Sequence, residues 1–362
     1  MKFNTKFYDK SYILDEIPSN SYEYNINKKI AIHIHIFYID MLDMFIDYLK
    51  NSPYKFDLLI SVNSEENKNI CIKKINNNSL KKLNKLLIKV VPNIGRDIAP
   101  LLIDFKEEQK EYDFICHIHT KKSLHNPAQK NWNNYLLNNL ISQSAIENII
   151  YNFIENNNIG IIFPPIFPET FHYILELNEL DKLNMRKLLD RMNINFIPDS
   201  SNFIFPTGTM FWYRKNVLKN LFDLNLLLDD LPKEPIPVTG TILHAIERLF
   251  GIVCEYNGYK IKCYIDRKEL VNALFYTYDL IEIRFENERI RFENERIRFE
   301  NERIRLNCNW FNLFGISNNS EYLRLTLFGI KFTFRVNEDI INNLAWWIPI
   351  RKLRDNFRNK FK

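Results

Sequence analysis

Two short stretches rich in imidazole, ammonium and carboxylate groups carry most of the chemistry that this chain offers. The first is Asn93-Ile94-Gly95-Arg96-Asp97, and the second is His117-Ile118-His119-Thr120-Lys121-Lys122-Ser123. Each stretch follows an apolar, strand-like run, and one helical segment separates the two. This order places both at the carboxyl ends of neighbouring strands of an α/β sheet, where such sheets bind ligands. A cluster of imidazole and ammonium groups suits a phosphorylated, anionic ligand.

The elements that must position these stretches alternate between strands and helices from Lys28 to about Lys262. Such alternation predicts an α/β fold with a mostly parallel sheet and helices on both of its faces. We therefore expect an N-terminal extension over residues 1–27 and one nucleotide-binding type of domain over residues 28–283. The expected strands span residues 30–38, 56–62, 86–91, 112–119, 159–163 and 211–213, and the expected helices include 41–49 and 241–250.

Composition and charge restrict the possible function classes. The chain has 362 residues and is 46% hydrophobic, which is enough for a large core and excludes a disordered protein. The net charge is +5, and residues 341–362 alone account for it, since six Lys or Arg stand there against Asp355. Residues 1–340 are thus balanced. This balance argues against a nucleic-acid binder, which would carry its basic residues along a stripe or groove.

The chain shows no targeting or disulfide signal. Its first twenty residues lack the apolar run of a signal peptide, and no uncharged stretch reaches the roughly 18 residues that a spanning helix needs. Five cysteines form no C-x-x-C pair, which argues against both a disulfide framework and a structural zinc site. We expect a reduced, cytoplasmic protein.

A different kind of sequence begins at Arg284, where Arg-Phe-Glu-Asn-Glu-Arg-Ile is repeated three times without a mismatch over residues 284–304. The repeats predict a helix of about 31 Å, tied by ion pairs such as Glu286 with Arg289 and Glu288 with Arg291. Phe285 and Ile290 lie about 140° apart around such a helix, so the usual coiled-coil seam is missing. Two interpretations stay open: a solvated, ion-paired spacer, and a helix through which the protein forms homo-oligomers.

The last segments predict a small β-meander over residues 305–340 and a basic amphipathic helix over residues 341–362. The stretch 323–334 alternates like a hairpin that turns at Gly329. After it, apolar side chains recur at three- and four-residue steps, as in a helix that lies in a membrane interface. The alternative is a terminal helix docked on the protein's own core. The residues expected to contact the membrane surface are Trp346, Trp347, Arg351, Lys352, Arg354 and Arg358.

The stretch from Val91 to Ser123 resembles the segment of GT-A glycosyltransferases in which an Asn-x-Gly turn opens a helix and the next strand ends at an Asp-x-Asp metal site. Here His117-Ile118-His119 stands where that Asp-x-Asp would be, so the acids are missing. Over about residues 28–270 the chain is similar to the rhamnan synthesis F family of bacterial polysaccharide glycosyltransferases. The similarity rests on four blocks in order: His35-Ile36-Phe37-Tyr38, Asn93 to Asp97, His119 to Ser123, and Gly208-Thr209-Met210-Phe211-Trp212 with His244-Ala245-Ile246-Glu247-Arg248.

This resemblance implies a GT-A-like hexosyltransferase that inverts the sugar's anomeric centre. The donor would be a nucleotide sugar, such as one carrying rhamnose or another deoxyhexose. The acceptor would be a bacterial surface polysaccharide or a lipid-linked glycan at the inner face of the cytoplasmic membrane. The other classes left open are a catalytically silent scaffold of a polysaccharide-synthesis complex and, more weakly, a nucleic-acid or nucleotide-binding module.

Such a reaction needs a base for the acceptor hydroxyl and positive charge for the departing diphosphate. Glu247 and His244, on the same side of one predicted helix, are the two candidates for the base. Asp97 would bind the donor's base or ribose, and Tyr38 would stack on the nucleobase. The remaining donor-binding candidates are Asn93, Gly95, Arg96, His117, His119, Thr120, Lys121 and Lys122. The candidates for the acceptor side or the pocket wall are His35, Gly208, Thr209 and Trp212.

Each assignment has a purely structural alternative. His33 and His35 suit satisfied sheet histidines, Arg96 and Asp97 suit an ion pair at a helix start, and Trp212 suits a core side chain. Glu247 with Arg248 equally suits a surface ion pair. We expect no metal dependence, because Mg²⁺ and Mn²⁺ favour oxygen ligands whereas His117-Ile118-His119 offers imidazoles; a divalent ion such as Mg or Mn stays the alternative.

Overall fold

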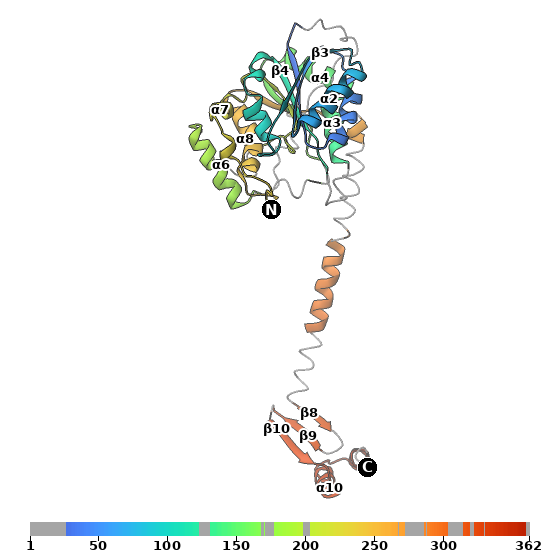
Figure 1. Ribbon diagram of the computed structural model, residues 1–362. Coiled ribbons are helices and arrows are strands. Elements are labelled where there is room, and N and C mark those ends of the chain that lie inside the picture. Colours follow the sequence, from blue (N-terminus) through green and yellow to red (C-terminus); the bar gives the residue numbers. More distant parts are fainter. Residues whose placement is uncertain are drawn as a thin grey trace. The chain divides into compact units, whose positions relative to one another are not determined.

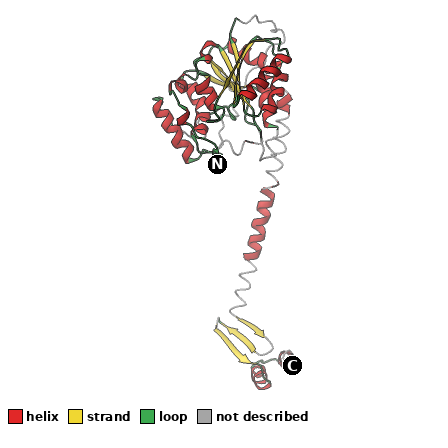
Figure 2. Ribbon diagram, viewed as in Figure 1, coloured by secondary structure: helices red, strands yellow, loops and turns green. Residues whose placement is uncertain are grey.

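The computed structural model describes residues 27–122, 131–167, 170, 177–197, 203–266, 268–271, 286, 288–302, 314–318, 322–328 and 330–359. It divides into two compact units, Met1–Thr277 and Tyr278–Lys362, and each is treated separately below (Figures 1 and 2). The predictions made for residues 1–26, Ser123, Phe285 and Gly329 lie outside the described residues.

The first unit is built on a seven-stranded sheet, which confirms the predicted α/β class with a mostly parallel sheet. Its strand order is β3-β2-β1-β4-β6-β5-β7. Only β6 runs antiparallel to its two neighbours, β4 and β5, among these strands. The strands are β1 (Ile30–Ile36), β2 (Phe56–Val62), β3 (Leu83–Val90), β4 (Phe114–His119), β5 (Ile159–Phe163), β6 (Phe211–Arg214) and β7 (Lys260–Cys263).

Helices cover both faces of this sheet. One face carries α1 (Leu42–Leu49), α2 (Glu65–Asn77), α3 (Trp132–Ile141) and α4 (Gln143–Glu155). The opposite face carries a π-helical turn (Pro100–Asp104) with α6 (Glu179–Arg191), α7 (Lys219–Asp223) and α8 (Ile242–Tyr256). Figure 1 shows α2, α3 and α4 on one side of the strands and α6, α7 and α8 on the other. Short 3₁₀ turns span Ile39–Met41, Glu108–Glu111 and Leu228–Asp230.

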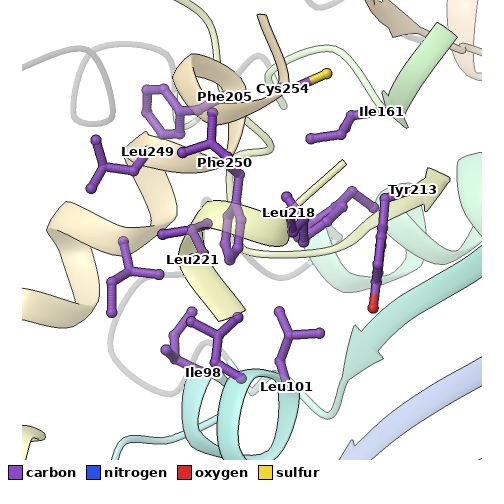
Figure 3. Close-up of a cluster of buried hydrophobic side chains, with 14 of the residues drawn as sticks. Ile98, Leu101, Ile161, Phe205, Tyr213, Leu218, Leu221, Leu249, Phe250 and Cys254 are labelled. Atoms are coloured by element: carbon purple, nitrogen blue, oxygen red, sulfur yellow. The ribbon is translucent and has the colours of Figure 1, made fainter. Parts of the chain in front are cut away.

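Alternation along the strands decides which side chains meet which helices. On β1, the isoleucines at 30, 32, 34 and 36 pack toward α1 and α3, whereas Ala31 packs toward α8. His33 and His35 share the face of Ala31, because strand residues two apart point the same way. The core on that face contains Ile98, Leu249 and Phe250 (Figure 3). The imidazoles of β1 therefore lie on the α8 side of the sheet.

Two helices that matter for the site begin at well-formed caps. Asn178 precedes α6, and its side chain accepts a hydrogen bond from the amide of Asp181 at 2.7 Å. Thr241 precedes α8 and forms a capping box with His244. Such caps satisfy amides that have no partner within the helix and fix where the first turn begins. They hold Asp181 and His244 in the first turns of their helices.

The described residues of the second unit form a helix in the repeat segment, a three-stranded sheet and two further helices. Residues 288–302 are helical and exposed. Glu286 pairs with Arg289 at 2.7 Å as predicted, while Arg291 pairs with Glu295 at 3.4 Å. The antiparallel sheet has the order β10-β9-β8, with β8 (Phe314–Asn318), β9 (Tyr322–Leu327) and β10 (Ile330–Arg335). The expected hairpin over residues 323–334 is confirmed, since β9 pairs with β10.

The prediction of one helix over residues 341–362 is wrong. The chain forms α10 (Glu338–Trp346) and a separate α11 (Arg351–Asn359). Pro349 explains the break, because proline lacks an amide and disfavours helical backbone at the residue before it. Trp346 therefore belongs to a different helix from Leu353, with which it was expected to share a face. None of the helices in the described part of the chain is long and apolar enough to cross a membrane.

Candidate functional site

The carboxyl ends of β1 and β4 are joined side by side. The strands pair in parallel with His33 opposite His117 and His35 opposite His119. Past the strands, the Thr120 amide donates to the carbonyl of His35 at 2.9 Å. The Thr120 hydroxyl oxygen accepts from the amides of Phe37 at 2.9 Å and Tyr38 at 3.1 Å. The blocks that end β1 and β4 thus meet. The prediction that Asn93–Asp97 and the stretch beginning at His117 follow neighbouring strands is wrong, because β2 and β1 lie between β3 and β4. The two stretches approach each other through Asp97 instead.

A buried imidazole cluster lies below these ends. The Nδ1 atoms of His33 and His117 are 3.0 Å apart, and His117 Nε2 lies 3.6 Å from a carboxylate oxygen of Asp97. Burial disfavours the charge of Asp97, but His119, His117 and the Thr209 hydroxyl outweigh it and hold the pKa of Asp97 well below its ordinary value. Asp97 is thus a buried anion that orients imidazoles, whereas we had expected it to bind a base or ribose.

The last of the four blocks reaches this cluster through Gly208. His119 Nε2 lies 2.9 Å from the Gly208 carbonyl oxygen, to which it donates, and 3.3 Å from the Thr209 hydroxyl. The Gly208 amide donates to Glu247 Oε1 at 2.6 Å. One residue of the chain therefore binds the imidazole of His119 through its carbonyl and the carboxylate of Glu247 through its amide.

Only glycine fits this position well. Gly208 has φ +82° and Thr209 follows with φ +54°. A Cβ atom on Gly208 would lie 3.2 Å from Trp132 Cζ2 and 3.6 Å from Lys121 Nζ. The left-handed backbone and the close approach of Trp132 both exclude a larger residue without strain. The backbone at 208–209 therefore lies close to both Lys121 and the carboxylate of Glu247.

Lys121 and Lys122 have different partners. Lys121 Nζ lies 3.7 Å from the centre of the Trp132 ring, a cation–π contact. Burial lowers the pKa of Lys121, while the carboxylates of Glu247 and Asp97 act in the opposite direction. Lys122 Nζ pairs with Asp40 at 2.5 Å and lies 4.8 Å from the centre of the Tyr38 ring. Lys121 thus belongs to the cluster around Gly208, and Lys122 to the rim beside Tyr38.

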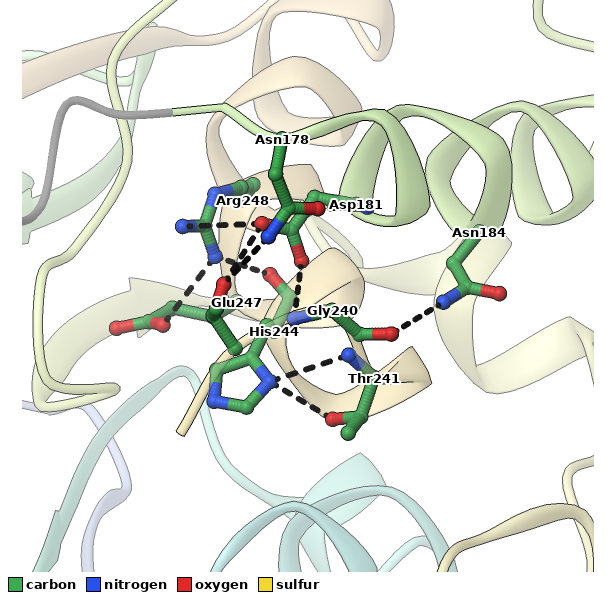
Figure 4. Close-up of polar contacts among 9 residues, drawn as sticks. Asn178, Asp181, Asn184, Gly240, Thr241, His244, Glu247 and Arg248 are labelled. Carbon is green, nitrogen blue, oxygen red and sulfur yellow. Dashed lines mark hydrogen bonds and ion pairs between the residues drawn. The ribbon is translucent and has the colours of Figure 1, made fainter. Parts of the chain in front are cut away.

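The two base candidates lie on α8 as predicted, in different hydrogen-bonding situations. His244 Nδ1 accepts from the Thr241 amide at 3.3 Å and lies 2.8 Å from the Thr241 hydroxyl. Burial lowers the pKa of His244, so its ring is held neutral, and a neutral ring that accepts at Nδ1 carries its proton on Nε2. Glu247 Oε2 lies 3.9 Å from Arg248 Nη1 (Figure 4).

The turn at 93–97 is fixed by contacts far along the chain. Arg96 Nε donates to Glu234 at 3.0 Å, so Arg96 pairs with this carboxylate and not with its neighbour Asp97. Gly95 has φ +71°, and a Cβ there would lie 2.4 Å from Leu231 Cδ1. Asn93 is exposed. The turn presents Asn93 and Arg96 outward and Asp97 inward.

Trp212, proposed for the pocket wall, lies on the wrong face of the sheet. It is buried in the core against α3, and its indole nitrogen donates to the Leu140 carbonyl at 2.9 Å. Because strand residues alternate, its neighbour Phe211 faces His117 instead. His35 is also buried, 2.9 Å from the Ser61 hydroxyl, and so supports the strand ends from within.

Several residues of the site escaped sequence reasoning. Trp132 lies against Lys121, Glu234 pairs with Arg96, and Asp181 lies 3.7 Å from Arg248. The contacts of Glu234 and Asp181 join residues that are distant in the chain, so no local pattern reveals them. Trp132 gave a local signal, because it opens an apolar helix soon after the lysines.

The donor atoms at the strand ends do not fit Mg²⁺ or Mn²⁺. Such ions need several oxygen ligands, and the side chains around Asp97 are imidazoles and a hydroxyl. Within the ranges that the structure covers, no three His, Cys, Asp or Glu side chains converge on a point where a metal ion would fit.

Two cavities of the first unit lie away from this cluster. One of about 560 Å³ is lined by Tyr48 of α1 and Ser142 between α3 and α4. The other, of about 430 Å³, lies between α6 and Ile242. The candidate site is instead a polar surface at the strand ends, where Glu247, Lys121 and Tyr38 are all partly exposed.

Comparison with known proteins places the chain in a family. Residues 3–259 match the model of a family described as Rhamnan synthesis protein F. Two curated relatives, each named "Uncharacterized protein WxcX", come from Xanthomonas campestris pv. campestris strains B100 and ATCC 33913. Each is 25% identical over 233 residues, which is 63% of this chain and 32% of the relative. The chain thus spans about a third of the length of these relatives.

The family match covers the whole candidate site, from β1 to α8. It extends over well more than half of the chain and includes all the blocks from which the similarity was first inferred. The protein therefore belongs to the rhamnan synthesis protein F family of polysaccharide-synthesis proteins.

Proposed function

We propose that the protein is an inverting glycosyltransferase of GT-A-like fold. It would transfer a sugar, such as rhamnose or another deoxyhexose, from a nucleoside diphosphate donor to a hydroxyl of a bacterial surface polysaccharide or lipid-linked glycan. The observation that carries this proposal is the junction at Gly208, whose amide binds a carboxylate and whose carbonyl binds an imidazole, with an ammonium group beside it. Family membership supports the proposal independently.

In the proposed reaction the acceptor oxygen attacks the anomeric carbon as the bond to the diphosphate oxygen breaks. The acceptor proton passes to Glu247, and the electron pair of the broken bond leaves with the diphosphate. Attack opposite the leaving group in a single displacement inverts the anomeric centre. Glu247 Oε1 is held by the Gly208 amide, so Oε2 is the oxygen that we assign to the proton.

Glu247 suits the base better than His244 does. The bonds from Thr241 leave His244 with a proton on Nε2, so this ring donates there and does not accept. The Glu247 carboxylate can accept a proton directly, whereas His244 would first have to move its own proton from Nε2. We therefore assign His244 to hydrogen bonding with the acceptor or donor, and Glu247 to general-base catalysis.

Positive charge for the leaving diphosphate would come chiefly from Lys121. Its ammonium group is partly buried, so its charge acts through less water than that of an exposed lysine. Arg96 and Lys122 are each paired with a carboxylate, Glu234 and Asp40 respectively. Their contribution would require those pairs to open or to share the ligand.

A panel of dTDP-, UDP- and GDP-linked hexoses tests the proposal on purified protein, with and without a chelator. We expect binding of one donor class and its slow hydrolysis, unaffected by the chelator. Binding without turnover of any donor would favour the silent scaffold instead. Absence of both binding and turnover would reject a donor site at the strand ends.

We also propose that the protein acts at the inner face of the cytoplasmic membrane, held there by α10 and α11. Trp346 and Trp347 are 70% and 79% exposed, and such side chains favour the membrane–water interface. Ile350, Leu353 and Phe357 recur at steps of three and four, as in one face of a helix. Arg351, Arg354 and Arg358 form an adjacent stripe at the same steps, suited to anionic headgroups.

Sedimentation with vesicles tests this attachment. We expect the full chain to bind phosphatidylcholine vesicles that contain phosphatidylglycerol, and to bind pure phosphatidylcholine much less. Replacing both Trp346 and Trp347 by serine should weaken binding to the mixed vesicles at least tenfold, while serine at Phe292 and Phe299 in the repeat helix should not. Equal binding by all three proteins would refute the role of the tail. Self-association of the repeats stays a prediction.

A further inference from the structure

A second set of charges lies behind Glu247, where α6 meets the segment that leads into α8. Asp181 Oδ1 accepts from the Gly240 amide, and Oδ2 accepts from the Thr239 hydroxyl, both at 3.0 Å. Asn184 donates to the Gly240 carbonyl at 3.1 Å. Both backbone polar groups of Gly240 are therefore bound by α6. This contact fixes the start of α8, the helix that carries Glu247.

Asp181 and Glu247 share one guanidinium group. Arg248 Nη2 lies 3.7 Å from Asp181, and Nη1 lies 3.9 Å from Glu247 (Figure 4). Asp181 is fully buried and Arg248 is 7% exposed. Arg248 also donates to the His244 carbonyl at 2.9 Å and lies over the Phe205 ring. A buried charge must be compensated by a close partner, and here one cation compensates two carboxylates.

From this arrangement, and building on the proposed function, we propose that Asp181 and Arg248 are positioning residues that control the charge of the base Glu247 in opposite directions. Arg248 stabilises the Glu247 carboxylate. Asp181 draws on the same cation and repels that carboxylate, so it favours the protonated form.

Two other titratable groups act on Glu247: Lys121 from the end of β4, and His244 from the preceding turn of α8. Arg96, from the turn at 93–97, acts on Lys121 and His244. Replacing Asp181 removes a negative charge and replacing Arg248 removes a positive one, so opposite effects on Glu247 are the characteristic outcome.

The test measures the pH dependence of donor hydrolysis in the full chain, with the nucleotide sugar that the panel above identifies, from about pH 5 to about pH 9. Asp181→Asn should move the acidic limb of the profile to lower pH, and Arg248→Met should move it to higher pH. The Arg248→Met shift should be about one pH unit or more, as for charges within about 4–6 Å, and the Asp181→Asn shift should have the opposite sign. Arg248→Lys keeps the cation and should restore the limb. Asp190→Asn and Arg186→Met, exposed on α6, are the matched controls.

A second readout separates this inference from the proposed function. The carboxyl carbon of Glu247, labelled with ¹³C and assigned by Glu247→Gln, is titrated by NMR in the same variants. If no donor turns over, the proposed function fails while the NMR titration still decides the inference. If circular dichroism shows that Arg248→Met does not fold, the titration of Glu247 is compared in Asp181→Asn and Arg248→Lys instead. Shifts of the same sign in Asp181→Asn and Arg248→Met, or no shift in Asp181→Asn, would overturn it.

Discussion

The ring nitrogens of His33 and His117 face each other at 3.0 Å between two parallel strands. One ring must donate and the other accept, so the pair requires one proton, and no more than one, between the facing nitrogens. His117 points its other nitrogen at Asp97, which favours a proton there. His33 is therefore the donor of the pair, and its neutral form is built into the middle of the sheet.

This arrangement predicts loss of stability in mild acid. Burial lowers the pKa of His33, His117 and His35, the last to about 4. In the unfolded chain these histidines take up protons near pH 6.5, whereas in the folded chain they stay neutral to lower pH. The free energy of unfolding therefore falls as the pH drops from about 6.5 toward 4. His35 alone accounts for about 2 kcal/mol at about pH 5. Urea unfolding as a function of pH measures this, and His35→Asn should flatten the dependence by that amount.

Replacing Glu247 by glutamine should abolish most activity and leave the fold intact. The glutamine carbonyl oxygen can still accept from the Gly208 amide, so the loss should reflect the missing base alone. We expect kcat to fall by roughly 10²–10⁴-fold. Glu255→Gln, an exposed position on the same helix, is the control. Wild-type turnover in Glu247→Gln would exclude Glu247 as the base.

Removing the charge of Lys121 should weaken donor binding. Methionine at this position keeps an apolar contact with the Trp132 ring but has no charge for the diphosphate. We expect donor Kd to rise by about tenfold, and the salt dependence of binding to become shallower. Titration calorimetry at two salt concentrations measures both effects. Lys85→Met, on an exposed part of β3, should change neither, and equal effects in both variants would reject a specific role.

Gly95 should tolerate no side chain, in contrast to Gly258. Both have a left-handed backbone, but a Cβ on Gly95 would lie 2.4 Å from Leu231 Cδ1, whereas one on Gly258 meets nothing within 4 Å. Gly258→Ala should therefore cost about 1 kcal/mol of backbone strain. Gly95→Ala adds overpacking and should cost about 3 kcal/mol. Chemical denaturation of the two variants compares them, and equal costs would contradict the packing described around Leu231.

Sequence reasoning succeeded where a local pattern has one structural meaning. Alternating isoleucine and histidine placed His33 and His35 on one face, and the pairing of β1 with β4 confirms it. The helix that carries Glu247 followed from Gly240 and the apolar run after it, and the structure confirms that helix. Both inferences needed only the period of the element and its start signal.

Long-range contacts set the limit of that reasoning. The partner of Arg96 is Glu234, 138 residues away, and nothing in either neighbourhood distinguishes this pair from one with Asp97. The face on which Trp212 lies depends on the phase of a four-residue strand, which is too short to show a period. The break between α10 and α11 was readable at Pro349, but the apolar spacing across it was given more weight.

The main chain at Gly208 ties the proton-accepting side of the site to the imidazole side. The amide and the carbonyl of Gly208 belong to two successive peptide groups, so the φ and ψ angles of this residue set how far apart the two bound side chains lie. Attempts to alter sugar preference should accordingly keep Gly208 and vary the side chains that border it.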